Sequence, residues 1–221
     1  MTCTTWTRTR TARRRPRTSS ALCLALAVGL AAGAADAGEA DGARAVVDRT
    51  VADVLTVLNE PGLSTDQRRD RIEAIALDRF DFDTMSRLVL ARNWRRFSES
   101  QQGEFVEQFR EYLSASYGDR IERYDQEKVD VAGDRIEPRG DVTVHTRIIG
   151  GQADGVQVDY RLRQRDGAWR VIDVVIEGVS LVSSYRDQFT EVLGNGGPDE
   201  LLRRLREKNI PRPEIPDTPS T

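Results

Sequence analysis

The pattern of apolar and polar positions begins with two helices. Apolar residues recur every three or four positions over residues 43–58, and this stripe ends at the turn-forming residues 59–62. Ser64 and Gln67 have the spacing of a capping box, in which each side chain bonds the other residue's backbone N–H. We therefore expect a second helix after the turn, packed back on the first.

Two further helices follow, and both have recognisable starts. Asp81 and Asp83 offer N-caps for a short helix that ends near residues 93–94. Ser98 and Gln101 repeat the capping-box spacing and open a helix with a bulky apolar face. The residues of that face are Phe105, Phe109, Tyr112, Leu113, Tyr117, Ile121 and Tyr124.

After Tyr124 the hydrophobic period changes from helical to two, which predicts strands. The expected strands are 129–131, 142–148, 156–162 and 169–175. Short glycine-containing turns separate them, so we expect an antiparallel meander with one polar, solvated face. In the last strand, Ile172, Val174 and Ile176 make the second face apolar too, which predicts that this strand is covered on both sides.

The end of the chain returns to helical spacing. Residues 181–192 predict a helix that stops at the glycine-rich segment 194–197, and Pro198 begins a short amphipathic helix. From Ile210 the tail is rich in proline and is expected to be extended or disordered. The fold class is therefore α+β: N-terminal helices, a meander of about four strands and C-terminal helices in a single domain.

The first 37 residues have the composition of a secretory signal peptide. Six arginines and no acid occupy residues 1–17, and a short apolar run with small residues after it follows. Cleavage is expected after Ala34 or Ala37, of which we favour Ala37. The run is shorter than the roughly 20 apolar residues that a membrane span needs, which argues against the alternative of an uncleaved anchor. The predicted division is 1–37 signal peptide, 38–209 folded domain and 210–221 flexible tail.

Charge and cysteine content narrow the functional classes. Removing residues 1–37 takes six of 33 basic and one of 36 acidic side chains, which leaves 27 against 35 and a net charge of −8. Such a chain lacks the basic surface of a nucleic-acid binder. Cys3 and Cys23 both leave with the signal peptide, so we expect neither a disulfide nor a thiolate metal site in the exported protein.

The residues that normally carry catalysis are few. His145 is the single histidine and lies on the polar strand face, which argues against a catalytic triad or a histidine-ligated metal. Asp173 is the candidate general acid or base, because parity places it with Trp169 and Val171 on the face expected to be buried. The structural alternative is that Asp173 pairs with an arginine, such as Arg186 or Arg92, or caps nearby backbone.

The apolar faces of the aromatic helix, the C-terminal helix and the sheet allow two interpretations. They fill an ordinary core, or they stand apart and leave an apolar cavity. The second interpretation suits an exported carrier of apolar ligands.

Two segments resemble signature regions of the MlaC family, also called toluene-tolerance auxiliary proteins. These are residues 80–94 (FDFDTMSRLVLARNW) and 169–189 (WRVIDVVIEGVSLVSSYRDQF). The order of parts over residues 40–209 is also similar. The chain departs from the family pattern in its proline-rich tail and at Ala91, where a glycine is expected before the arginine.

The resemblance implies a function without catalysis. Members of the family are soluble periplasmic carriers of Gram-negative bacteria. They shuttle phospholipid between an outer-membrane lipoprotein–porin complex and an inner-membrane ABC transporter, and so help to maintain outer-membrane lipid asymmetry. The acyl chains lie in a cavity between sheet and helices, and the head group stays outside. For this chain we accordingly expect a monomeric carrier in the periplasm, with phospholipid as ligand, no cofactor, no metal and no nucleic acid.

Carried over to this sequence, the resemblance suggests thirteen cavity-wall residues, each apolar or aromatic and inward-facing by period. They are Phe82, Met85, Leu88, Phe105, Phe109, Leu113, Val144, Val158, Tyr160, Val171, Val175, Val179 and Tyr185. Arg92, Arg147 and Arg186 are weaker candidates for the cavity mouth or for partner docking. Two other functions remain open: a small cone-shaped, isomerase-like enzyme that uses Asp173, and an accessory subunit with a filled core.

Overall fold

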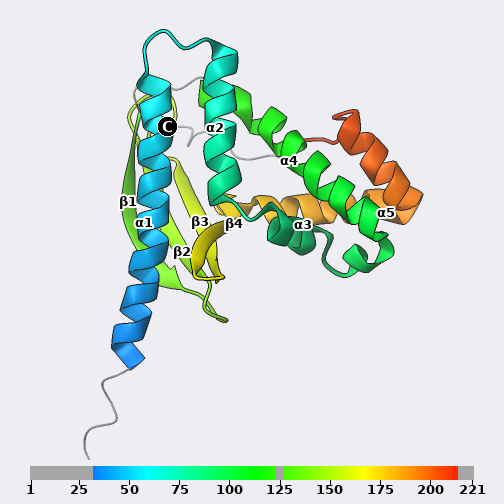
Figure 1. Cartoon of the computed structure of the whole chain (residues 1–221), viewed down its shortest axis with the longest axis horizontal. Coiled ribbons are helices and arrows are strands. Elements are labelled where there is room, and N and C mark those ends of the chain that lie inside the picture. The colour runs from blue at the N-terminus through cyan, green and yellow to red at the C-terminus, as the bar shows by residue number, and fades with distance from the viewer. Residues whose placement is uncertain (1–31, 123–126, 214–221) are drawn as a thin grey trace, which may run out of the picture.

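A computed structural model describes residues 32–122 and 127–213 (Figure 1). The helices, in chain order, are α1 (Ala32–Asn59), α2 (Thr65–Arg79), α3 (Phe82–Leu90), the 3₁₀ helix η1 (Ala91–Arg96), α4 (Glu99–Glu122) and α5 (Leu181–Arg206). The strands are β1 (Lys128–Ile136), β2 (Val142–Ile149), β3 (Gln157–Arg165), β4 (Ala168–Ile176) and β5 (Val179–Ser180). The predicted α+β class is confirmed.

The predicted caps fix the starts of three helices. The Gln67 backbone N–H donates to Ser64 Oγ at 3.2 Å, and the Ser64 N–H donates to Gln67 Oε1 at 2.9 Å. Ser98 and Gln101 form the same pair of bonds before α4, and Asp81 accepts from the Thr84 N–H at the start of α3. Each cap satisfies backbone donors that the first helical turn leaves without a partner.

Helix α1 begins earlier than predicted, at Ala32 rather than near residue 43. The two predicted cleavage points therefore fall within its first residues, and the rest of the predicted signal peptide lies outside the described residues. Farther along, α1 lies across one face of the sheet, and α2 runs back beside it (Figure 1). Gly42 allows this close approach, because a Cβ there would lie 2.8 Å from the Trp169 indole nitrogen.

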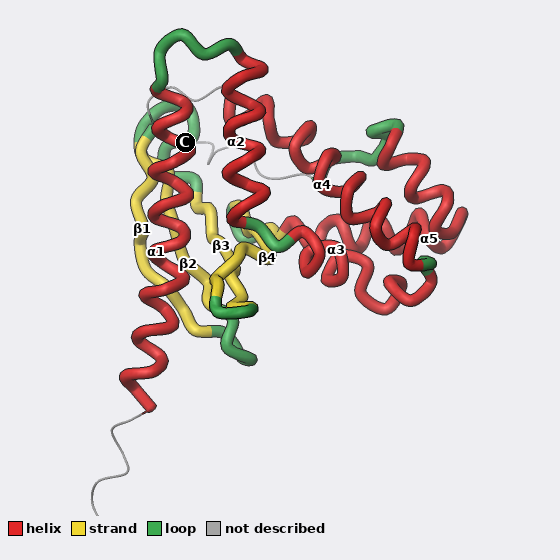
Figure 2. Tube along the Cα trace, viewed as in Figure 1, coloured by secondary structure: helices red, strands yellow, loops and turns green. Residues whose placement is uncertain are grey.

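The sheet is an antiparallel meander with strand order β1-β2-β3-β4-β5. The four predicted strands are present. The additional strand, β5, has two residues and returns through a turn in which Glu177 and Gly178 both have positive φ. A pair this short carries no hydrophobic period, which is why the sequence did not indicate it. Figure 2 shows the strands grouped behind α1 and α2, beside a separate group formed by α3, α4 and α5.

A β-bulge at Ile172 changes which side chains of β4 face inward. Arg161 pairs with Asp173, but the next residue, Leu162, pairs with Val171, so Ile172 has no partner on β3. The predicted unbroken alternation from Trp169 to Val175 is therefore wrong. Beyond the bulge the two faces exchange, and Asp173 and Val175 lie on the opposite face from Val171.

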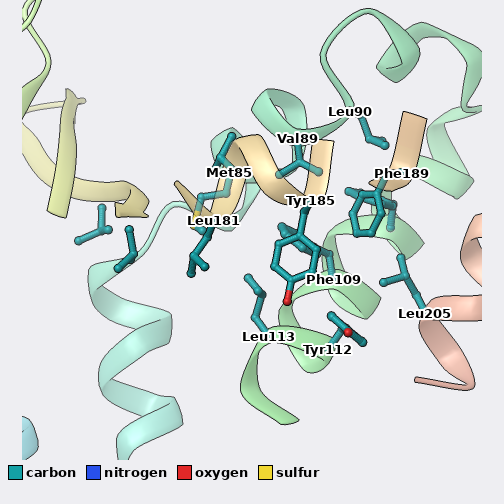
Figure 3. Packing of buried hydrophobic residues seen from close by; sticks show 14 of the residues in the cluster. Met85, Val89, Leu90, Phe109, Tyr112, Leu113, Leu181, Tyr185, Phe189 and Leu205 are labelled. Atoms are coloured by element: carbon teal, nitrogen blue, oxygen red, sulfur yellow. The ribbon is translucent and has the colours of Figure 1, made fainter. Parts of the chain in front are cut away.

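The largest buried side chains form an aromatic cluster between α4 and α5 (Figure 3). Phe105 and Phe109 come from α4, and Tyr185 and Phe189 come from α5. Their ring centroids lie 5.6 to 5.8 Å apart, mostly in edge-to-face arrangements. These side chains are buried among one another, so this part of the molecule is a filled core.

The C-terminal segment is held more firmly than predicted. Helix α5 is kinked at Gly197, where φ is 73°, and Pro198 follows, as the glycine–proline sequence indicated. Beyond the helix, Ile210 is buried and its carbonyl accepts a 2.6 Å hydrogen bond from the Tyr112 hydroxyl. The contacts of the described residues therefore include Ile210, the first residue after the predicted boundary. The tail residues 214–221 lie outside the described residues.

Candidate functional site

A cavity of about 340 Å³ lies between the sheet, α2 and α4. Its volume falls within the range of about 300–1,000 Å³ that is usual for small-molecule sites. Its apolar and aromatic lining residues are Leu58, Ile72, Ala76, Leu77, Phe80, Phe82, Met85, Leu113, Tyr117, Val158, Tyr160, Val174, Ile176 and Leu181.

The sheet forms one wall of the cavity through two adjacent strands. Val158 and Tyr160 come from β3, and their cross-strand partners on β4 are Ile176 and Val174. These partners face the cavity because the bulge at Ile172 has shifted the alternation of β4 by one residue.

Helix α2 forms the opposite wall and has an unusual burial pattern. It contains no buried residue, and its apolar residues Ile72, Ala76 and Leu77 line the cavity. Ion pairs join α2 to α1 and the adjoining turn, such as Arg71 with Glu60 at 2.5 Å. The apolar face of α2 is therefore directed at the cavity rather than packed into the main core.

Charged side chains lie at one side of the lining. Arg68, Arg69 and Glu73 come from α2, and Arg110 comes from α4. The side chains of Arg69 and Arg110 are 43% and 30% exposed, and Leu77, farther along α2, is 45% exposed. The cavity thus opens to solvent between α2 and α4, and we call these four charged residues the rim.

Burial keeps the phenols of Tyr160 and Tyr185 protonated at neutral pH. Burial raises the pKa of Tyr160 to about 12, and burial also raises the pKa of Tyr185. The Tyr185 hydroxyl lies 3.5 Å from the Tyr117 hydroxyl. The described interior wall is accordingly neutral and apolar, a lining suited to holding an apolar molecule.

Asp173, the candidate catalytic acid, does not line this cavity. It is buried, accepts hydrogen bonds from Ser180 Oγ at 2.6 Å and from the Val182 N–H at 3.1 Å, and lies 3.9 Å from the Arg161 guanidinium. Burial raises the pKa of the Asp173 carboxyl, although these hydrogen bonds and Arg161 act in the opposite direction. The expected capping role is thus present, but the arginine partner is Arg161 rather than Arg186 or Arg92.

The structure brings five of the thirteen predicted wall residues into the cavity lining, namely Phe82, Met85, Leu113, Val158 and Tyr160. Five others are buried in the core outside that lining, namely Phe105, Phe109, Val144, Val171 and Tyr185. Leu88, Val175 and Val179 are partly buried and also lie outside it. Val175 lies outside the lining because the bulge puts it on the other face of β4. Phe105, Phe109 and Tyr185 lie outside it because their rings pack against each other.

The three predicted mouth arginines also lie outside the lining. Arg92 is exposed in η1 and Arg147 is exposed on β2. The Arg186 Nε donates to the Leu88 carbonyl at 3.0 Å, which ties α5 to the last turn of α3. Sequence reasoning missed Arg68 and Arg110, whose positions beside the apolar stripes of α2 and α4 were the available signal.

The described residues contain neither a metal-binding cluster nor a membrane-spanning helix. No group of three or more histidine, cysteine, aspartate or glutamate side chains in residues 32–122 and 127–213 is placed to hold a metal ion. Over the same ranges, none of the helices combines the length and the apolar character that crossing a membrane requires.

An α+β domain whose sheet and helices enclose an apolar cavity with a charged rim belongs to the class of proteins with a pocket for apolar or amphipathic molecules. The chain matches the family model described as MlaC protein over residues 48–207, and it belongs to this family.

Individual relatives agree with that assignment. The chain is 24% identical over 120 residues to toluene tolerance protein ttg2D of Pseudomonas putida, covering 54% of this chain and 56% of that protein. It is 23% identical over 125 residues to the intermembrane phospholipid transport system binding protein MlaC of Haemophilus influenzae, covering 54% and 58%. The matched part therefore spans little more than half the length of either relative.

A solved structure covers more of the fold. The phospholipid-binding protein from Ralstonia solanacearum, in complex with a phospholipid, superposes with a TM-score of 0.68 at 26% sequence identity. The match covers 76% of this chain and 96% of that one.

Proposed function

We propose that this protein is a phospholipid carrier that holds the acyl chains in the cavity and leaves the head group at the rim. The observation that carries the proposal is the apolar face of α2, which lines the cavity although the helix has no buried residue. An acyl chain between α2 and the sheet would cover both apolar surfaces. The phospholipid complex of the Ralstonia solanacearum relative supports the choice of ligand.

The energetics of such binding are sufficient without a strong charge contact. Each buried methylene contributes about 0.8 kcal/mol, so an acyl chain that fills the cavity supplies most of the affinity. A head group at the solvent-exposed rim between α2 and α4 stays partly hydrated, which limits the cost of desolvating its charge. The lipid would be extracted from a membrane and released again by passive exchange.

The proposal also covers where the protein acts in the cell and between which membrane complexes it carries lipid. The basic and apolar start of the chain suggests export to the periplasm. Membership in the MlaC family suggests handover between an outer-membrane lipoprotein–porin complex and an inner-membrane ABC transporter. In this role the protein maintains lipid asymmetry and acts without catalysis. The location of Asp173 outside the cavity lining argues against the isomerase-like alternative.

A pair of adjacent substitutions on β3 tests the proposal. Val158→Trp places an indole in the cavity, whereas Gln157→Trp adds the same side chain at an exposed neighbouring position. Each lipid-free protein is incubated with phosphatidylglycerol vesicles and separated from them, and the bound phosphorus per chain is measured. We expect Val158→Trp to lose uptake and Gln157→Trp to retain it. Equal uptake by both variants would contradict the proposed site.

A further inference from the structure

Two arginines of the rim, Arg68 and Arg110, line the cavity and have little contact with carboxylates. Their Nε atoms are shielded and have no hydrogen-bond acceptor among the described residues; the same holds for the Nε of Arg79, but Arg79 pairs with Asp53 and Asp78 and does not line the cavity. The nearest carboxylate oxygen paired with Arg110 belongs to Glu111 and lies 4.0 Å away. Within the described part of the chain, no carboxylate pairs with Arg68. By contrast, Arg71 on the same helix bonds Glu60 at 2.5 Å.

The positions of the two arginines relate them to the cavity rather than to open solvent. Arg68 precedes Ile72 by one helical turn on α2, and Arg110 precedes Leu113 and Ser114 by about one turn on α4. Both helices therefore present an arginine beside an apolar stripe that lines the same cavity. Both side chains line the cavity, and arginines in such positions typically cover apolar surface with their aliphatic stems while the guanidinium stays toward solvent.

We propose that Arg68 and Arg110 bind the phosphate group of the lipid, an inference that rests on the proposed carrier function. A guanidinium offers two parallel N–H donors that match two phosphate oxygens, and among the described residues no carboxylate pairs with Arg68 and the one that pairs with Arg110 lies 4.0 Å away. The rim carries three arginines, of which Arg69 pairs with Asp66 at 3.7 Å, and one glutamate, Glu73, so its charge favours an anion although the whole chain has a net charge of −3. The phosphate would supply the acceptors that the protein does not.

This assignment implies selection for a chemical class of lipid. A diacylglycerol with the same acyl chains would occupy the cavity and gain the same burial, but it would leave both guanidinium groups without acceptors. Phospholipids should therefore be preferred whatever their alcohol group, because the contacts involve the phosphate that all of them share.

The experiment compares three proteins and two lipids. Lipid-free wild type, Arg68→Gln and Arg110→Gln are titrated with vesicles containing dioleoylphosphatidylglycerol or dioleoylglycerol, and bound lipid is quantified by mass spectrometry. Arg95→Gln is the control, because it removes an exposed arginine of η1 that lies outside the cavity lining. We expect each rim variant to bind the phospholipid about tenfold more weakly and the control to bind like wild type. Dioleoylglycerol binding should be unchanged in all variants, which also shows that they are folded.

Three results would overturn the inference. The rim variants could bind the phospholipid as well as wild type does, or they could lose affinity for both lipids equally, which indicates a structural role. Alternatively, millimolar inorganic phosphate could occupy the wild-type site with no lipid present, which indicates a site for the free anion. In each of these cases wild type still binds phospholipid. If wild type binds neither lipid, the carrier function itself is wrong.

Discussion

The Ser180 hydroxyl donates a 2.6 Å hydrogen bond to the Asp173 carboxylate, and this bond joins β4 to the beginning of α5. The same hydroxyl accepts from the Ser183 N–H as the helix N-cap, while Asp173 also accepts from the Val182 N–H. Asp173 thus anchors the first turn of the helix that supplies Leu181 to the cavity and Tyr185 to the core.

We predict that Asp173→Ala lowers the free energy of unfolding by about 2–3 kcal/mol, because it leaves buried donors without an acceptor. Phospholipid uptake per folded molecule should not change, since Asp173 does not line the cavity. Urea unfolding monitored by circular dichroism, with the exposed Asp70→Ala as control, measures the first effect. A stable variant that has lost a catalytic activity would instead revive the enzyme hypothesis.

Because the pKa of the Asp173 carboxyl is raised in the folded state, the free energy of unfolding should depend on pH. Because the folded state holds this proton more tightly than the unfolded state, the contribution of the protonated carboxyl is complete below the unfolded pKa. It is lost as the pH rises through the raised folded pKa. The stability advantage of wild type over Asp173→Asn should therefore be larger at pH 4 than at pH 8. A larger advantage at pH 8 would show that the hydrogen bonds and Arg161 outweigh burial.

Asp173 shows one limit of prediction from the sequence. Its burial was predicted correctly, but the face of the sheet on which it lies was not, because the alternation of β4 was assumed to continue through Ile172, where the bulge lies. A bulge depends on the pairing between two strands, and Trp169 to Ile176 contains no glycine or proline that would mark it. Local signals were more reliable: Ser64 and Ser98 cap their helices as predicted, since a capping box is formed within four residues.

Ala91 adopts φ 47° and ψ −122° at the end of α3, a backbone conformation suited to glycine. This is the position at which the family resemblance led us to expect glycine. We predict that Ala91→Gly raises the free energy of unfolding by about 1 kcal/mol, because the relief of strain exceeds the added entropy of the unfolded chain. Ala74→Gly, in the exposed middle of α2, should lower it by about 1 kcal/mol. Thermal unfolding of both variants checks the contrast, and a loss of stability at both positions would refute the assignment of strain.

The contact between Tyr112 and Ile210 predicts that the start of the tail is structural. A chain that ends after residue 209 loses the burial of the Ile210 side chain and the hydrogen bond to its carbonyl, so its free energy of unfolding should fall by about 3 kcal/mol. A chain that ends after Pro213 retains both and is the control. Equal stability of the two truncated chains would support the predicted boundary at residue 209.

Because the apolar face of α2 lines the cavity, a substitution on this face should weaken lipid binding more than it lowers the stability of the protein. Ile72→Ser should weaken phospholipid uptake about tenfold, because it removes apolar surface from the cavity wall. The lipid-free protein should lose less than about 1 kcal/mol, because Ile72 is not part of the buried core. Ala74→Ser on the exposed side of the helix is the control. A large loss of stability in Ile72→Ser with unchanged uptake would show that this face is ordinary packing.

The cavity itself was only partly predictable from the sequence. Periodicity identified Val158 and Tyr160 as inward-facing, but the same criterion also selected Phe105 and Phe109, whose rings fill a core. An apolar face has the same period whether it contacts another element or a ligand, so tertiary packing decides between the two. The rim was missed for a related reason, because an arginine on an amphipathic helix is usually solvated, and the shielded Nε of Arg68 becomes visible only in the fold.

The most direct test of the carrier function is a native mass spectrum of the protein expressed with its own signal peptide and purified from the periplasm without detergent. The account predicts a mass that exceeds the cleaved chain by one phospholipid, which lipid extraction then identifies. A mass equal to the lipid-free chain, together with failure to take up lipid from phosphatidylglycerol vesicles, would contradict it.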